Sequence, residues 1–144
     1  MNTTLFRAGL AGLAAAALFA GPAAVAETQV YKATLTAANQ VPPNASKATG
    51  ALTSTYDTAT KKFTWTVIYA GLSGPPTAAH FHGPAAAGAN AGVVVPQKDG
   101  LASPMKGEAT LTDTQAADLQ AGKWYFNIHT EANKGGEIRG QAMK

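Results

Sequence analysis

Two of the chain's three histidines, His80 and His82, are separated by a single residue in the segment 79–84. In a β-strand, side chains at positions i and i+2 point to the same face and lie about 6.5–7 Å apart along the strand. Two imidazoles at that spacing can converge on one metal ion about 2.0–2.1 Å from each ring nitrogen. The pair is therefore half of a metal chelate, although two ordinary exposed polar side chains would have the same pattern.

The third histidine, His129, belongs to the segment 124–130, in which polar and apolar residues alternate. The segment predicts a strand with its aromatic and aliphatic side chains on one face and His129 on the other. If this strand neighbours that of His80 and His82, all three histidines meet. The chain has no cysteine, so thiolate metal sites and cysteine nucleophiles are excluded and a metal site must use nitrogen or oxygen ligands.

The elements that position these histidines are predicted to be short strands separated by turns rich in Gly, Pro and Asn. The predicted strands are 30–38, 50–56, 61–70, 77–82, 92–95, 107–111, 124–130 and 137–143. A capping-box pattern from Thr112 to Gln115 predicts one two-turn helix that ends near Gly122. Many short strands favour an all-β fold, an antiparallel Greek-key β-sandwich or barrel with one short helix. The low-complexity segment 85–92 is expected to be an exposed loop near the histidines.

Residues 1–26 have the pattern of a secretory signal peptide: Arg7, an apolar run over 8–20 and a small-x-small ending at Ala26. That run is shorter than the roughly 20 residues that span a bilayer. We therefore expect a periplasmic or secreted protein without stable membrane insertion after signal removal, with residues 27–144 as one domain. Its ten basic and eight acidic residues are scattered, which argues against a nucleic-acid partner.

Three separated motifs carry a family resemblance: His-Phe-His-Gly-Pro at 80–84, Tyr-Phe-Asn-Ile-His-Thr at 125–130 and Gly-Glu-Ile-Arg-Gly-Gln at 136–141. Together they resemble the chordin-type, or CHRD, domain over about residues 31–143. The resemblance implies a β-sandwich similar to copper-zinc superoxide dismutase. Some bacterial members are understood to bind copper and act as superoxide dismutases, whereas in chordin the domain belongs to an extracellular binding protein.

Carried over to this chain, the resemblance makes His80, His82 and His129 the ligands of one copper ion. Imidazole suits zinc as well, so zinc is an alternative occupant, but copper binds more tightly in the Irving–Williams order. Dismutation of superoxide requires a one-electron cycle, which zinc cannot provide. If the protein is a dismutase, the metal is copper.

Arg139, in the third motif, is the candidate catalytic residue, because a guanidinium near an open copper position would attract a small anion such as superoxide. Its alternative role is an ion pair with Glu137. Glu137 and Asn127 are candidates for accepting a ring N–H from a histidine ligand, which would fix the histidine tautomer.

The sequence departs from the copper-zinc dismutase pattern because it has no cysteine, no second histidine cluster and no fourth histidine. Two other functions therefore stay open, a copper carrier or buffer without turnover and a metal-free β-sandwich binding module. A hydrolase is not favoured, because the chain has no G-x-S-x-G nucleophile elbow.

Overall fold

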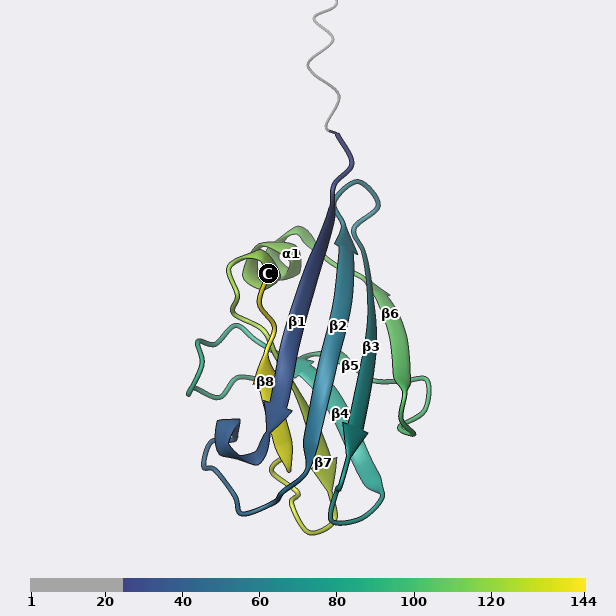
Figure 1. Cartoon of the computed structure of the whole chain (residues 1–144). Coiled ribbons are helices and arrows are strands. Elements are labelled where there is room, and N and C mark those ends of the chain that lie inside the picture. Colours follow the sequence, from purple (N-terminus) through teal and green to yellow (C-terminus); the bar gives the residue numbers. More distant parts are fainter. Residues whose placement is uncertain (1–24) are drawn as a thin grey trace, which may run out of the picture.

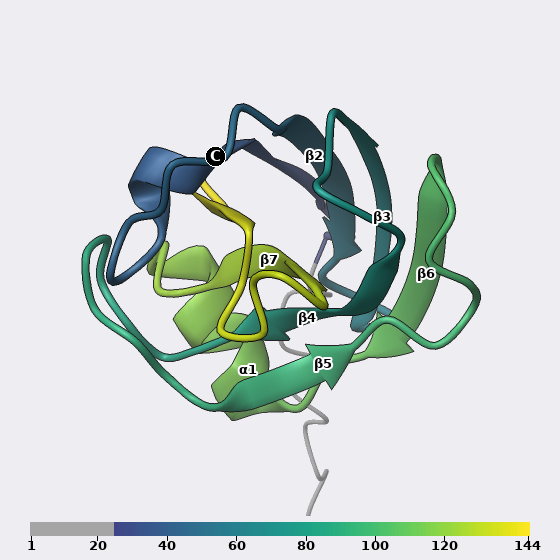
Figure 2. The same ribbon diagram turned by 90° about the horizontal axis from the view of Figure 1, so that it is seen from below.

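Eight antiparallel strands and one short helix form a nearly closed barrel in the computed structural model, which describes residues 25–144 (Figures 1 and 2). The elements are β1 Thr28–Thr36, the 3-10 helix η1 Ala37–Asn39, β2 Thr49–Asp57, β3 Lys62–Ala70, β4 Pro76–His82, β5 Val93–Pro96, β6 Met105–Thr110, α1 Asp113–Gln120, β7 Tyr125–Thr130 and β8 Ile138–Gln141. The predicted signal peptide, apart from its last two residues, lies outside the described residues. No helix in the described part of the chain is long and apolar enough to cross a bilayer.

The strands are ordered β5-β4-β7-β8-β1-β2-β3-β6 around the barrel. β1, β2 and β3 form a meander, while β7 lies between β4 and β8, which are distant from each other in sequence. The side chain of Gln97, directly after β5, connects the two strands at the ends of this order, β5 and β6. Trp65 Nε1 on β3 donates to Gln97 Oε1 over 2.7 Å, and Gln97 Nε2 donates to the carbonyl oxygen of Lys106 on β6 over 2.8 Å.

Inward-facing aromatic side chains fill the barrel. Phe81 on β4 packs edge-to-face against Phe63 and Phe126, with ring centroids 5.1 and 4.8 Å apart, the offset geometry that aromatic pairs prefer. Gly107 on β6 faces Trp65 on β3, and a Cβ at residue 107 would clash with the indole. On β4 and β7 the side chains of Phe81, Phe126 and Ile128 are thus buried in the core, and the histidines alternate with them on the opposite faces of these two strands.

The predicted helix is confirmed, with its capping box formed. Gln115 N–H donates to Thr112 Oγ1 over 3.2 Å, and Thr112 N–H donates to Gln115 Oε1 over 3.0 Å. These bonds satisfy N–H groups that a helix start leaves without partners. Gly122 follows the helix with a φ of 69°, the left-handed conformation that glycine adopts without strain.

The all-β fold with antiparallel strands is confirmed, and its form is a nearly closed barrel. Most strand boundaries lie one or two residues from the predicted positions, among them the ends of β1 and β8. Residues 37–39 form a 3-10 helix rather than the end of a strand, and β8 covers Ile138–Gln141 rather than 137–143. Beyond β8, Met143 makes an isolated bridge to Lys32 on β1, so the C-terminal segment follows the barrel without continuing the strand.

Candidate metal centre

The pairing of β4 with β7 brings all three histidines together, which meets the condition that the sequence analysis set for a shared site. In the antiparallel register, His80 faces Asn127, His82 faces Tyr125 and Ala78 faces His129. One ring nitrogen from each histidine lies within 4.8 Å of the others. Nitrogens bound to one ion lie at most about 4.2 Å apart, since each metal–nitrogen distance is about 2.0–2.1 Å. The cluster can therefore hold a metal ion after shifts of less than 1 Å.

Main-chain carbonyls orient two of the rings. His82 Nδ1 lies 2.9 Å from the carbonyl oxygen of Ala91, and His129 Nδ1 lies 2.8 Å from that of Lys134. A carbonyl oxygen can only accept a hydrogen bond, so both Nδ1 atoms are the donors. In the neutral rings, both Nε2 atoms then carry lone pairs, which is the state in which imidazole binds metal ions.

Asn127 lies between these two lone pairs. Its Oδ1 is 2.9 Å from His82 Nε2 and 3.0 Å from His129 Nε2, and the residue is only 3 % exposed. The two Nε2 lone pairs and the amide oxygen are all hydrogen-bond acceptors, so none of the three can donate to another. Either a cation sits among them, or the amide is turned so that its NH₂ group donates to both rings. Both arrangements keep the rings aimed at a common point.

The buried Nδ1 of His80 has no hydrogen-bond partner. Burial lowers the pKa of His80, and the nearby His129 and His82 act in the same direction. Burial also lowers the pKa of His82, against hydrogen bonds that raise it. Both rings are consequently neutral at neutral pH and present lone pairs rather than competing protons. An orphaned nitrogen beside two oriented ones fits a metal ion.

Arg139 lies on the far side of Tyr125 from His82. The His82 and Tyr125 rings are parallel with centroids 4.8 Å apart, and Arg139 Cζ lies 3.4 Å from the Tyr125 centroid. Since β4 and β8 flank β7 on opposite sides, the phenol ring is sandwiched between imidazole and guanidinium. Arg139 is 2 % exposed and donates to Asn90 Oδ1 over 2.9 Å and to the carbonyl oxygen of Ala89. No residue type or spacing in the sequence pointed to this role of Tyr125.

Glu137 contacts neither Arg139 nor a histidine ring. Its carboxylate accepts hydrogen bonds from the hydroxyls of Ser46, Ser73 and Thr130 and from the main-chain N–H of Ser73. Burial alone would raise its pKa, but these bonds outweigh burial and lower the pKa to about 2. The alternative ion pair with Arg139 is thus not formed, and main-chain carbonyls, not Glu137, accept the ring N–H groups of His82 and His129.

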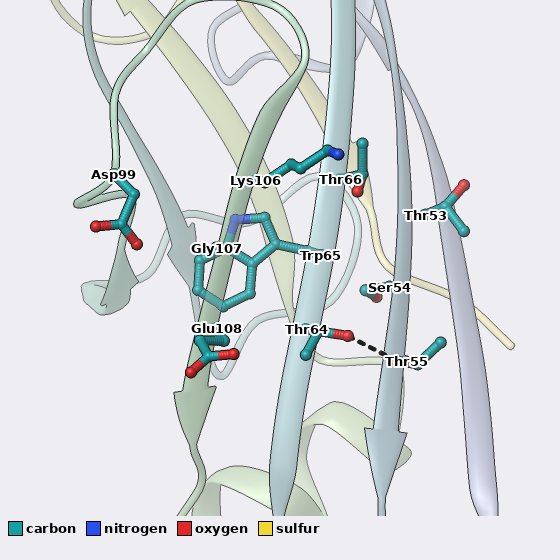
Figure 3. A pocket seen from close by; sticks show the side chains of 10 residues that line it. All are labelled: Thr53, Ser54, Thr55, Thr64, Trp65, Thr66, Asp99, Lys106, Gly107 and Glu108. Carbon is teal, nitrogen blue, oxygen red and sulfur yellow. Dashed lines mark hydrogen bonds between the residues drawn. The ribbon is translucent and has the colours of Figure 1, made fainter.

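A large open hollow lies elsewhere, over the outer face of β2, β3 and β6 (Figure 3). Its volume is about 640 Å³, and its lining includes four threonines together with Asp99, Lys106 and Glu108. Thr55 and Thr64 hydroxyls bond to each other across its floor over 2.7 Å. None of the histidines lines it, so its size does not identify it with the metal centre.

The CHRD domain family matches residues 31–142, and the chain belongs to this family. The match contains all three histidines, Asn127 and Arg139. No curated protein and no solved structure is significantly similar to the chain. The family assignment therefore rests on the domain match, and the chemistry rests on the geometry of the centre.

Proposed function

We propose that this CHRD-domain protein is secreted or periplasmic, binds one copper ion through His80, His82 and His129, and dismutates superoxide there. The observation that carries the proposal is the cluster of three ring nitrogens within 4.8 Å, two of them aimed by main-chain carbonyls. Imidazole ligands suit copper, which binds more tightly than zinc to a given nitrogen site. Bound copper would supply the one-electron oxidation and reduction that dismutation needs.

Asn127 is the natural fourth donor, because its amide already lies within 3.0 Å of both Nε2 atoms. A set of three nitrogens and one neutral oxygen donor leaves room for a weakly held ligand. Before metal binds, the amide would orient the rings by donating its NH₂ group to both Nε2 atoms, and it would turn to present Oδ1 to the ion.

Arg139 would attract the anionic substrate through its electrostatic field rather than by contact. Its guanidinium is separated from His82 by the Tyr125 ring. Its charge nevertheless contributes, after burial and His129, to the lowered pKa of His82. A positive potential of this kind raises the local concentration of a small anion and weakens with salt.

A copper carrier or buffer is the second candidate, and one observation favours it. Two acceptors in the segment 83–92, Ala89 and Asn90, already engage Arg139, and His82 and Asn127 are buried. A partly covered centre, beside a guanidinium that is already hydrogen-bonded, suits retention of the ion. The metal-free binding module has less support, because the exposed large apolar side chains of the described residues are few and far apart in sequence: Val25, Val30, Ile68, Val93 and Met143.

A copper titration of the mature protein, followed by a superoxide dismutation assay, separates these functions. The dismutase predicts one equivalent of tightly bound copper and turnover, both lost in His80→Ala and His129→Ala. Thr34→Ala, which changes an exposed residue on β1, should behave as wild type. Tight copper binding without turnover would favour the copper carrier. Absence of stoichiometric copper binding would favour the metal-free binding module.

A further inference from the structure

The buried charge of Arg139 has no acidic partner in the described part of the chain. The ion pairs among residues 25–144 are on the surface: Lys61–Asp113, Lys62–Glu108 and Lys134–Glu131. A buried charge is costly to desolvate unless it is compensated. The face of Tyr125 and two hydrogen-bond acceptors compensate Arg139 in part. A guanidinium has five N–H donors, so most of its capacity is left for another partner.

A cavity of about 280 Å³ adjoins this guanidinium. Arg139 and Gln141 of β8 form part of its lining, and residues 38–41, at the end of η1 and just after it, and residues 87–88 form the rest. None of the lining residues is acidic. The cavity is large enough for a small polyatomic anion, and its only formal charge is positive.

Two orphaned polar atoms belong to residues that line this cavity. Gln40 is 5 % exposed, and its Nε2 has no hydrogen-bond partner. The amide lies against Gly136, where a Cβ would be only 2.5 Å from Gln40 Nε2. Gln141 Oε1 is also buried and unpartnered, while its Nε2 donates to the carbonyl oxygens of Ala85 and Gly122. Buried polar atoms without partners are uncommon in folded proteins.

We propose that this cavity, which we call the Arg139 cavity, binds a small protonated oxyanion of the phosphate class. The guanidinium and the Gln40 amide are donors for its oxygens, and Gln141 Oε1 is the acceptor for its O–H. Phosphate carries at least one O–H near neutral pH, whereas sulfate carries none. The donor and acceptor set therefore selects phosphate over sulfate, in addition to the general preference of arginine for oxyanions.

The Arg139 cavity is distinct from the metal centre. The Tyr125 ring separates the guanidinium from His82, and none of the three histidines lines the cavity. An anion held there is consequently not a ligand of the metal, and its binding does not depend on the proposed copper chemistry.

Calorimetric titration of the metal-free protein with inorganic phosphate, and separately with sulfate, tests the proposal. We expect saturable binding of one phosphate per chain and at least tenfold weaker binding of sulfate. Gln40→Leu should weaken phosphate binding at least fivefold. Ala87→Asp, which places a carboxylate on the exposed rim of the cavity, should abolish binding without disturbing the core.

Two controls make the result decisive. Ala59→Asp adds the same charge in the exposed turn between β2 and β3 and should bind phosphate as wild type does. His80→Ala should also bind phosphate normally. The proposal is overturned by non-saturable binding, by equal affinity for sulfate, by an Ala87→Asp variant that still binds, or by loss of binding in His80→Ala, which would move the anion to the histidines.

Discussion

Glu137 should make the barrel sensitive to acid. The hydrogen bonds from Ser46, Thr130 and Ser73 outweigh burial and hold the pKa of this carboxyl at about 2, against an ordinary value of 4.5. Because the unfolded chain takes up the proton first as pH falls, the carboxylate stabilises the fold fully above pH 4.5. That stabilisation is lost progressively as pH falls through 4.5 toward 2. The pKa difference corresponds to about 3 kcal/mol at pH 7, of which about 2 kcal/mol is lost by pH 3.

The assay is urea unfolding at pH 7, 5 and 3 for the wild type and for Glu137→Gln. The wild type should lose about 2 kcal/mol more unfolding free energy between pH 7 and pH 3 than the variant, since the variant has no proton to bind at this position. Glu131→Gln is the matched control, because Glu131 is an exposed carboxylate in the same β7–β8 connection and its removal should leave the pH dependence near that of wild type. Equal pH dependence in the wild type and Glu137→Gln would refute the reasoning.

Three further predictions concern packing, capping and the metal centre. Gly140→Ala should lower the unfolding free energy by about 1–3 kcal/mol, because its Cβ would clash with the main-chain oxygen of Thr34. The control Gly92→Ala, whose Cβ meets open space, should stay within about 0.5 kcal/mol of wild type. Equal losses of stability in the two variants would contradict the argument. Thr112→Ala removes the helix cap and should cost about 1 kcal/mol in urea unfolding, whereas no change would show that the cap does not stabilise α1. Asn127→Leu should weaken copper binding about 10–100-fold in a competition titration; unchanged affinity would remove Asn127 from the site.

The strands and the helix were predictable because their signals are local. The alternation in 61–70 and 124–130 predicted β3 and β7 to within one residue, and the Thr112–Gln115 pattern predicted α1. Each signal is a period of two or a spacing of three residues, which the backbone geometry imposes directly. The end of β8 was less predictable, because Met143, two residues beyond the strand, still pairs with Lys32 in an isolated bridge.

The sequence indicated which histidine side chains could form the metal centre, but not the main-chain atoms that orient them. The sequence placed the three histidines on strands and on one face, but the pairing of β4 with β7 decides whether they meet. The atoms that orient the rings are the carbonyl oxygens of Ala91 and Lys134. Every residue has a carbonyl, so no residue type could have identified them.

The roles of Glu137 and Arg139 depended on distant segments. The hydroxyl groups of Ser46 and Ser73 reach Glu137 from 91 and 64 residues away. Arg139 instead meets the ring of Tyr125 and the acceptors of a loop about 50 residues away. Strand alternation placed both charges on one face, but it could not show that each has its own partners.

Electron paramagnetic resonance of the protein loaded with one equivalent of Cu(II) tests the central claim most directly. We predict one bound copper with hyperfine coupling to three imidazole nitrogens, reduced to two in His80→Ala and in His129→Ala and unchanged in Thr34→Ala. Copper that does not bind stoichiometrically, or a spectrum that is the same in both histidine variants as in wild type, would contradict a centre built from His80, His82 and His129.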